Sequence, residues 1–368
     1  MDGLRRVEGV DAARGVALLG MMAVHVLPPL DPDGTVSAID AVARGRSSAA
    51  FAVLAGVALA LANGGSRPLQ GRVWAGASCG LLVRCLLIAL LGLWLGGLGS
   101  GLAIILVYYA LLFCLAGPLL ALPARALGVL AVGVGLLAPA LSHVLRADLP
   151  AYPNQVPSWG DLGAPERLLT ELALGGTYPV LVWTTYLCAG LVVGRLRLSA
   201  TQTAWKLLVG GAVLAVASKL VSSVLVEGAV ATGSLPGDVG PMIFHGTTPT
   251  DSWWWLAIAA PHSSTPLDLA HTTGTALVLL AAMLLVAPRA EVWLRPLAWM
   301  GSMTLTLYTM HAVALAYEWG PADREQLYLA HVLAAFAIAS CWRSWAPRGP
   351  LEQLVSWPSR RTAALVGG

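Results

Sequence analysis

Two ionisable side chains, Arg14 and His25, lie in a segment that is otherwise apolar enough to enter a bilayer. Such residues are costly to bury and mark functional sites. If the segment is an α-helix, both project from one face and are separated by roughly 16 Å along the axis. That face carries a guanidinium, which suits phosphate, and an imidazole, which suits proton transfer. A snorkelling arginine neutralised by Asp11 is the simpler alternative.

Two further pairs of polar side chains follow helical spacing. Asp268 and His271 are three residues apart, as are Tyr308 and His311, so each pair lies on one helix face. If their helices cross the membrane, His25, His271 and His311 fall at a similar depth, and we expect them to line one pocket. Asp268 would fix the tautomer of His271 there. The simpler alternative is that these groups hydrogen-bond the helices to one another.

Other polar residues in apolar stretches have simpler expected roles. His331 has no polar neighbours in its stretch, so we expect it to have an interfacial or packing role. Lys219, with Glu227 two turns later, fits a structural ion pair as well as a site. The three tryptophans at 253–255 are typical of an interfacial aromatic belt or, alternatively, form a stacking floor for a sugar or lipid headgroup. Ligands scattered over several helices do not favour a metal site, so no metal is expected.

The composition is that of an integral membrane protein. Of 368 residues, 57% are hydrophobic and only 11% are charged, against about 25% charged in soluble domains. The net charge of +3 is too small and too dispersed to indicate a nucleic-acid partner. The five cysteines show no Cys-x-x-Cys spacing, which argues against a disulfide framework or a zinc site.

The apolar stretches define the predicted architecture, since a helix needs about 20 residues to cross a bilayer. We predict an all-α polytopic membrane protein, a bundle of about ten transmembrane helices in one domain over 1–345. The connections 146–174 and 228–266 are predicted as outer loops, and 346–368 as an amphipathic cytoplasmic tail. The ten stretches lie near 10–30, 47–64, 78–98, 101–122, 125–145, 175–194, 206–227, 267–287, 296–317 and 327–343.

The basic residues orient the predicted spans. With the start of the chain inside, the inner connections hold most arginines and lysines and the outer loops hold most acids, as the positive-inside rule requires. Both termini are therefore expected in the cytoplasm. The excess of arginine over lysine favours a bacterial chain, so we expect a bacterial plasma membrane, with membrane lipids around the bundle. The first segment is expected to stay uncleaved, since Asp11 and Arg14 stand at its threshold.

Several strings of residues resemble known membrane protein families. Arg14 followed by His25, with ten residues between them, resembles the first-helix signature of acyltransferase-three type enzymes and their relatives, the heparan-alpha-glucosaminide N-acetyltransferases. Over nearly its full length the chain is similar to the bacterial YeiB-like proteins, catalogued as domain of unknown function 418. The matching strings are Asp11 to Gly15, Pro261 to Gly274, Met300 to His311 and Gly349 to Glu352.

The resemblance implies a transmembrane-acyltransferase-like fold and an acyl-CoA donor, which we expect to be acetyl-CoA. The donor would enter from the cytoplasm, where Asp11 and Arg14 would form its binding site and Arg14 would hold its phosphates. The separation of Arg14 from His25 is about the reach of a pantetheine arm. His25 would then act near the acceptor as a general base, either in direct transfer or through a transient acyl-histidine.

The remaining polar pairs complete this hypothesis. Asp268 with His271, or His311 with Tyr308, would orient His25 or stabilise the oxyanion. The acceptor would be a hydroxyl or amine of a glycan, lipid or small secreted metabolite at the outer leaflet, and the chain could act as a homodimer. Two other classes stay open, a transporter or flippase that uses the buried His, Asp and Lys groups and a noncatalytic membrane partner. The sequence shows no convincing inverted repeat, which disfavours a transporter.

Overall fold

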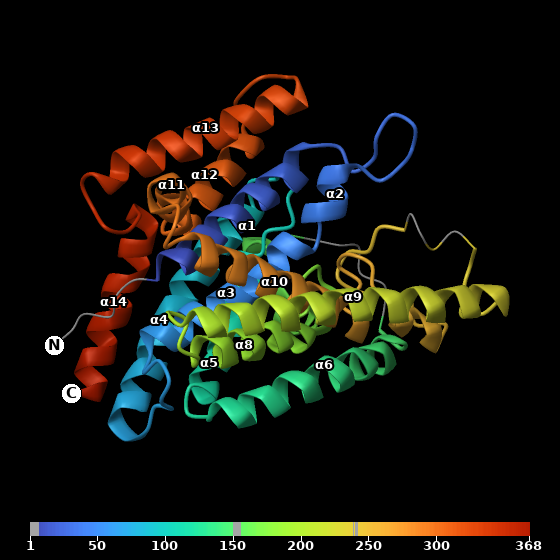
Figure 1. Ribbon diagram of the computed structural model, residues 1–368, viewed down its shortest axis with the longest axis horizontal. Helices are drawn as coiled ribbons and strands as arrows, with labels where there is room; N and C mark the ends of the chain where they lie inside the picture. The colour runs from blue at the N-terminus through green and yellow to red at the C-terminus, as the bar shows by residue number, and fades with distance from the viewer. Residues whose placement is uncertain (1–6, 150–155, 238, 240–241) are drawn as a thin grey trace.

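The computed structural model describes residues 7–149, 156–237, 239 and 242–368 (Figure 1). Within these ranges the chain is all-helical, as predicted, and extended segments pair only in an isolated bridge between Leu30 and Val36. Residues 1–6, and 150–155, 238 and 240–241 of the two long connections, lie outside the described part. The helices are α1 (Glu8–Val26), α2 (Ala38–Ala43), α3 (Arg46–Ala62), α4 (Gly71–Gly96), α5 (Leu106–Leu119), α6 (Ala124–Arg146), α7 (Pro165–Thr170), α8 (Val180–Gly194), α9 (Thr201–Ala231), α10 (Pro266–Val286), α11 (Glu291–Gly301), α12 (Thr304–Ala316), α13 (Arg324–Arg343) and α14 (Pro350–Gly367), with the short turns η1 (Trp159–Gly163), η2 (Glu171–Gly175) and η3 (Trp253–Ala257).

The helices confirm a polytopic membrane protein but not ten spans. In the described part of the chain, six helical segments are long and apolar enough to cross a membrane, or seven if the bent pair formed by Pro165–Gly175 and Val180–Gly194 is one span. The predicted fourth span is shorter, because α5 has 14 residues. The predicted ninth span is two helices, because the chain breaks at Ser302 and Met303 between α11 and α12. Hydropathy runs through such breaks and cannot reveal them.

Helix α1 runs through the middle of the bundle. It packs against α3, α10, α11 and α13, and Figure 1 shows α13 and α6 on opposite sides of this central group. We call the end of α1 at Asp11 and Arg14 the arginine end and the end at His25 the histidine end. The same helix therefore connects the arginine end to the histidine end, and other helices and loops contribute residues to both ends.

Helices α1 and α11 touch backbone to backbone at the arginine end. A Cβ atom added to Gly15 would lie 2.2 Å from the carbonyl oxygen of Leu297, and one added to Gly301 would lie 1.7 Å from that of Asp11. No side chain fits at such distances, so glycine is required at both positions. This contact brings Arg14 against the junction of α11 and α12.

The C-terminal tail belongs to the arginine end. Helix α14 packs along α4, where a Cβ on Gly80 would lie 2.5 Å from the carbonyl oxygen of Ser359. From α14, the Glu352 carboxylate accepts hydrogen bonds from the backbone N–H of Leu305 (2.6 Å) and from the N–H and hydroxyl of Thr306 (3.2 and 2.6 Å). Glu352 thus satisfies donors that the first turn of α12 would leave free.

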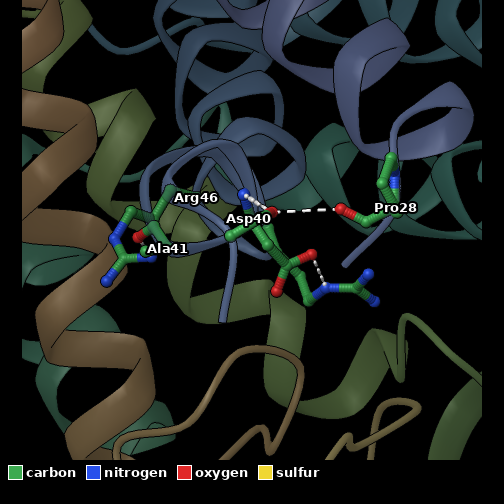
Figure 2. A network of polar contacts seen from close by, with 6 residues as sticks. Pro28, Asp40, Ala41 and Arg46 are labelled. Atoms are coloured by element: carbon green, nitrogen blue, oxygen red, sulfur yellow. Dashed lines mark hydrogen bonds and ion pairs between the residues drawn. The ribbon is translucent and has the colours of Figure 1, made fainter. Parts of the chain in front are cut away.

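A short helix and a tight turn complete the histidine end. The Ser37 side chain donates to the carbonyl of Pro28 (3.0 Å) and accepts from the N–H of Asp40 (3.2 Å), so it fixes the start of α2. Asp40 forms an ion pair with Arg44, and Arg46 donates to the carbonyl of Ala41. Figure 2 shows Pro28, Asp40, Ala41 and Arg46 around this turn. The turn thereby holds Arg44 beside His25 at the end of α1, whereas Arg46 reaches His271 of α10.

Candidate functional site

Three imidazole rings form a continuous chain at the histidine end. The Nδ1 of His25 lies 3.2 Å from the Nε2 of His311, and the Nδ1 of His311 lies 2.7 Å from the Nδ1 of His331. The rings of His25 and His311 are stacked with centroids 5.3 Å apart. His311 and His331 are 3% and 8% exposed, whereas His25 is half-buried. The chain therefore leads from the bundle interior to an accessible ring.

His25 opens into a cavity of about 190 Å³. The residues around the cavity come from several elements and are mostly polar or aromatic, and among them are Arg44, Tyr178, His245 and His262. The hydroxyl of Tyr178 is occupied, because it donates to the carbonyl of Ala103 (3.2 Å). The cavity thus offers an accessible imidazole, a guanidinium and two more imidazoles to a small molecule.

His262 reaches the cavity on a strained turn that polar side chains from two helices hold in place. His262 has φ +58° and Ser264 has φ +54°, a left-handed conformation that is uncommon in residues other than glycine. Lys219 of α9 donates to the carbonyl of Ala259, and the carboxylate of Asp268 in α10 accepts from the N–H of Ser264 (3.1 Å). Burial, together with the charge of Arg44, lowers the pKa of His262 to about 4. The ring is therefore neutral at neutral pH.

His271 belongs to a second polar group, and the pocket expected from sequence needs correction here. Its Nδ1 hydrogen-bonds the carbonyl of Ala215 (2.9 Å), and its Nε2 accepts from the Nε of Arg46 (3.2 Å). Both ring nitrogens thus have partners other than the expected Asp268, whose carboxylate caps the turn before α10 instead. Helical spacing placed Asp268 and His271 on one face, but it could not show that other elements supply the partners of each.

Tyr308 lies near His25 as expected, but it also faces a different helix. The two rings are 6.4 Å apart in an edge-on arrangement, and the Tyr308 hydroxyl accepts from the backbone N–H of Ile105 at 3.5 Å. The structure therefore brings His25, Tyr308 and His311 together and adds His331, for which the sequence predicted an interfacial or packing role. Sequence reasoning also missed His262 and Arg44, because turns bring them to α1.

Arg14 is half-buried and is held in place at the arginine end. Its Nη2 donates to the hydroxyl of Thr304 (2.6 Å), and its Nη1 lies 3.9 Å from Asp11. The charges of Arg14, Arg348 and Glu352 all act on Arg84 of α4. Three arginines and a glutamate from four different segments therefore share this region, and the excess of positive charge suits an anionic ligand.

Among the described residues, no group of three or more His, Cys, Asp or Glu side chains is arranged to hold a metal ion. The chemistry that these side chains themselves offer is proton transfer at the histidine end and anion binding at the arginine end. The two functions would lie at opposite ends of one helix.

Comparison with known proteins finds one matching family. A family model described as "Heparan-alpha-glucosaminide N-acetyltransferase, catalytic" matches residues 6–222. The matched part begins just before α1, includes Arg14, His25 and Arg44, and ends within α9. Helices α10 to α14, with His311 and His331, follow the matched part. No curated protein matches the chain.

Proposed function

The chain belongs to the family of the heparan-alpha-glucosaminide N-acetyltransferase catalytic domain, and we propose that it is a membrane acyltransferase with acyl-CoA, above all acetyl-CoA, as donor. The acceptor is an amine or hydroxyl of a glycan, lipid or small metabolite. The donor nucleotide binds at the arginine end, and transfer takes place at the histidine end. The observation that carries this proposal is the position of His25, half-buried at the cavity and on the same helix as Arg14.

In the proposed reaction, His25 is the general base. The acceptor N–H or O–H gives its proton to the free ring nitrogen of His25 as the acceptor atom attacks the thioester carbonyl. A bond forms between the acceptor atom and the acyl carbon, the carbon–sulfur bond breaks, and the CoA thiolate leaves and takes up a proton. Neutral His262 can donate an N–H to the oxyanion that develops during attack.

The arginine end supports the donor site by charge and by distance. Arg14 keeps a fixed orientation through Thr304, and a planar guanidinium can bind phosphate with two parallel hydrogen bonds. The eleven residues from Arg14 to His25 rise by roughly 16 Å in a helix, about the reach of a pantetheine arm. One helix can therefore serve both the phosphates and the thioester of the same donor.

The proposal includes an orientation. The arginine end faces the cytoplasm, where acyl-CoA is available, and the histidine end faces the outer leaflet of a bacterial plasma membrane. It is supported by the basic residues of the short connections, which follow the positive-inside rule. We also propose that the chain is related to the YeiB-like proteins, which it resembles over nearly its full length. The acceptor is proposed to lie at the outer surface of the membrane.

The test is an assay of the purified chain in detergent or nanodiscs with acetyl-CoA and a panel of amino sugars, sugars and primary amines. Thiol release measures loss of the acyl group from CoA, and mass spectrometry identifies the acetylated product. We expect thiol release above that of heat-denatured protein, and one acceptor class should raise it. Transport of a panel compound into proteoliposomes, without thiol release in any reaction, would favour the transporter alternative instead.

A further inference from the structure

The three-histidine chain has a fixed end that decides which nitrogen of each ring carries the proton. The backbone of Trp319 lies beside the ring of His331, and the N–H of Trp319 already donates to the carbonyl of Ala314 (2.8 Å). The carbonyl of Trp319 is therefore the backbone group that can pair with the second ring nitrogen of His331. A carbonyl can only accept, so the ring nitrogen that faces it must carry a proton.

Starting from His331, the position of the proton on each of the other two rings can be deduced in turn. A neutral imidazole has one donor and one acceptor nitrogen. If Nε2 of His331 donates to Trp319, its Nδ1 accepts from the Nδ1 of His311, since these atoms are 2.7 Å apart. The Nε2 of His311 then accepts from the Nδ1 of His25 at 3.2 Å. The last nitrogen, Nε2 of His25, is left without a proton at the ring that lines the cavity.

We infer that His311 and His331 are positioning residues that hold His25 in the tautomer with a proton on Nδ1 and a free electron pair on Nε2. This inference rests on the proposed function, in which His25 is the base. Helices α12 and α13 supply the two residues, and both lie beyond the part of the chain that the family model matches. They do not touch the substrate and act only through His25.

The hydrogen bonds also stabilise the protonated state of His25. When Nε2 takes the acceptor proton, the ring becomes an imidazolium whose Nδ1–H still donates to Nε2 of His311, a charge-assisted bond that is stronger than the neutral one. Return of the same proton from Nε2 to the leaving thiolate restores the starting tautomer. The chain of rings therefore neither gains nor loses protons over a turnover.

The groups that face His25 from every side determine its response to pH. Arg44, His245 and His262 line the same cavity as His25, and Tyr308 and His311 face it from α12. Substitution of His331 leaves these five residues in place. A changed pH profile in a His331 variant therefore reports on the chain behind His25.

Two substitutions of His331 separate positioning from packing. His331→Leu keeps the bulk but removes the acceptor for His311, whereas His331→Asn places a carbonyl oxygen close to the position of Nδ1. We expect His331→Leu to lower kcat for thiol release about 10-fold to 100-fold, the range found when the hydrogen-bond partner that orients a metal-ligating histidine is removed, with an unchanged KM for acetyl-CoA. His331→Asn should recover most of the rate, and His143→Leu, at a buried histidine of α6, should not affect it.

The tautomer itself is measured by NMR of the chain labelled with ¹⁵N-histidine and does not depend on turnover. We expect the protonated nitrogen of His25 to be Nδ1 in the wild type and in His331→Asn, with both tautomers populated in His331→Leu. A wild-type proton on Nε2, or equal rates and pH profiles for the Leu and Asn variants, would overturn the inference. If His25→Ala were fully active, the proposed function would fail instead, whatever tautomer the spectrum shows.

Discussion

The two ends of α1 are built on opposite principles. At the arginine end the backbones of α1 and α11 touch through Gly15 and Gly301, and Glu352 closes the first turn of α12. At the histidine end the chain opens into a cavity of about 190 Å³, with His25 half-buried beside it. The arginine end is held by contacts that allow no added atom, whereas the histidine end leaves room for a second molecule.

This difference indicates where each kind of substitution should act. Changes at the histidine end should alter the rate and leave the fold intact, because His25 is half-buried and borders a cavity. Changes at the arginine end should first alter the stability of the fold or the affinity for the donor, because Arg14 depends on the junction of α11 and α12 for its position.

The largest effect is expected from His25→Ala. Loss of a general base typically lowers a rate by about 10² to 10⁴, so thiol release from acetyl-CoA should fall by that factor. The unfolding midpoint and the affinity for acetyl-CoA should stay near wild type. His143→Ala, at a histidine packed against Trp253 with the two rings tilted, is the matched control and should keep full activity. Wild-type turnover in His25→Ala would show that His25 is not the general base.

At the arginine end, Gly301→Ala should reduce the free energy of unfolding. The added Cβ would lie 1.7 Å from the Asp11 carbonyl, so α1 and α11 must separate, at a cost of about 1–3 kcal/mol. Thermal unfolding in detergent measures the loss. Gly128→Ala is the control, because a Cβ there meets no atom within 4 Å. Equal unfolding midpoints for the two variants would contradict the backbone contact.

Arg14→Lys should weaken donor binding without loss of the positive charge. Lysine lacks the planar fork of arginine, and one charge-assisted hydrogen bond contributes about 1.5–3 kcal/mol, so the Kd for acetyl-CoA should rise about tenfold or more. Isothermal titration calorimetry measures it, with the exposed Arg125→Lys as control. Unchanged affinity in both Arg14→Lys and Arg14→Ala would mean that Arg14 only snorkels.

A smaller effect is expected from His262, which has a pKa lowered to about 4 by burial and by the charge of Arg44. An unfolded histidine titrates near 6.5. Between these values the unfolded chain binds more protons, so the free energy of unfolding falls as the pH falls, by at most about 1.4 kcal/mol per unit. His262→Asn should lose less stability than wild type between pH 7 and pH 5. An equal loss in both would contradict a ring that stays neutral in the folded chain.

The last prediction concerns orientation and should leave the rate unchanged. In a variant without its native cysteines, single cysteines at Gly160 and Gly237 should react with an impermeant maleimide added outside cells. One at Gly128 should not react. The reverse pattern would place the arginine end outside and contradict the proposed side of donor binding.

The sequence predicted the helical bundle and some of the residues of the candidate site, but not the residues that pack around them. Arg14, His25, Tyr308 and His311 could be singled out because ionisable and aromatic groups at helical spacing in apolar stretches are rare. The hydrogen-bond partners of these residues could not be found in this way. His331, for example, has no polar neighbour along the chain, yet its Nδ1 lies 2.7 Å from the Nδ1 of His311. Spacing within one helix carries no information about which helix packs against it.

The loop residues and the helix breaks were hidden for a related reason. His262 reaches the cavity through a turn with positive φ, which no periodicity indicates. The break at Ser302 and Met303, which lets Glu352 cap α12, lies in a continuous apolar stretch. These features depend on contacts between distant segments and emerge only in the folded chain.

The central claim is that one helix binds the donor phosphates at Arg14 and presents the acyl group to His25. A cryo-electron microscopy structure of the chain with a non-hydrolysable acetyl-CoA analogue tests it most directly. We expect nucleotide density beside Arg14 and Thr304, with the pantetheine arm extending along α1 toward His25. Nucleotide density in the cavity at His25, with none beside Arg14, would contradict the account.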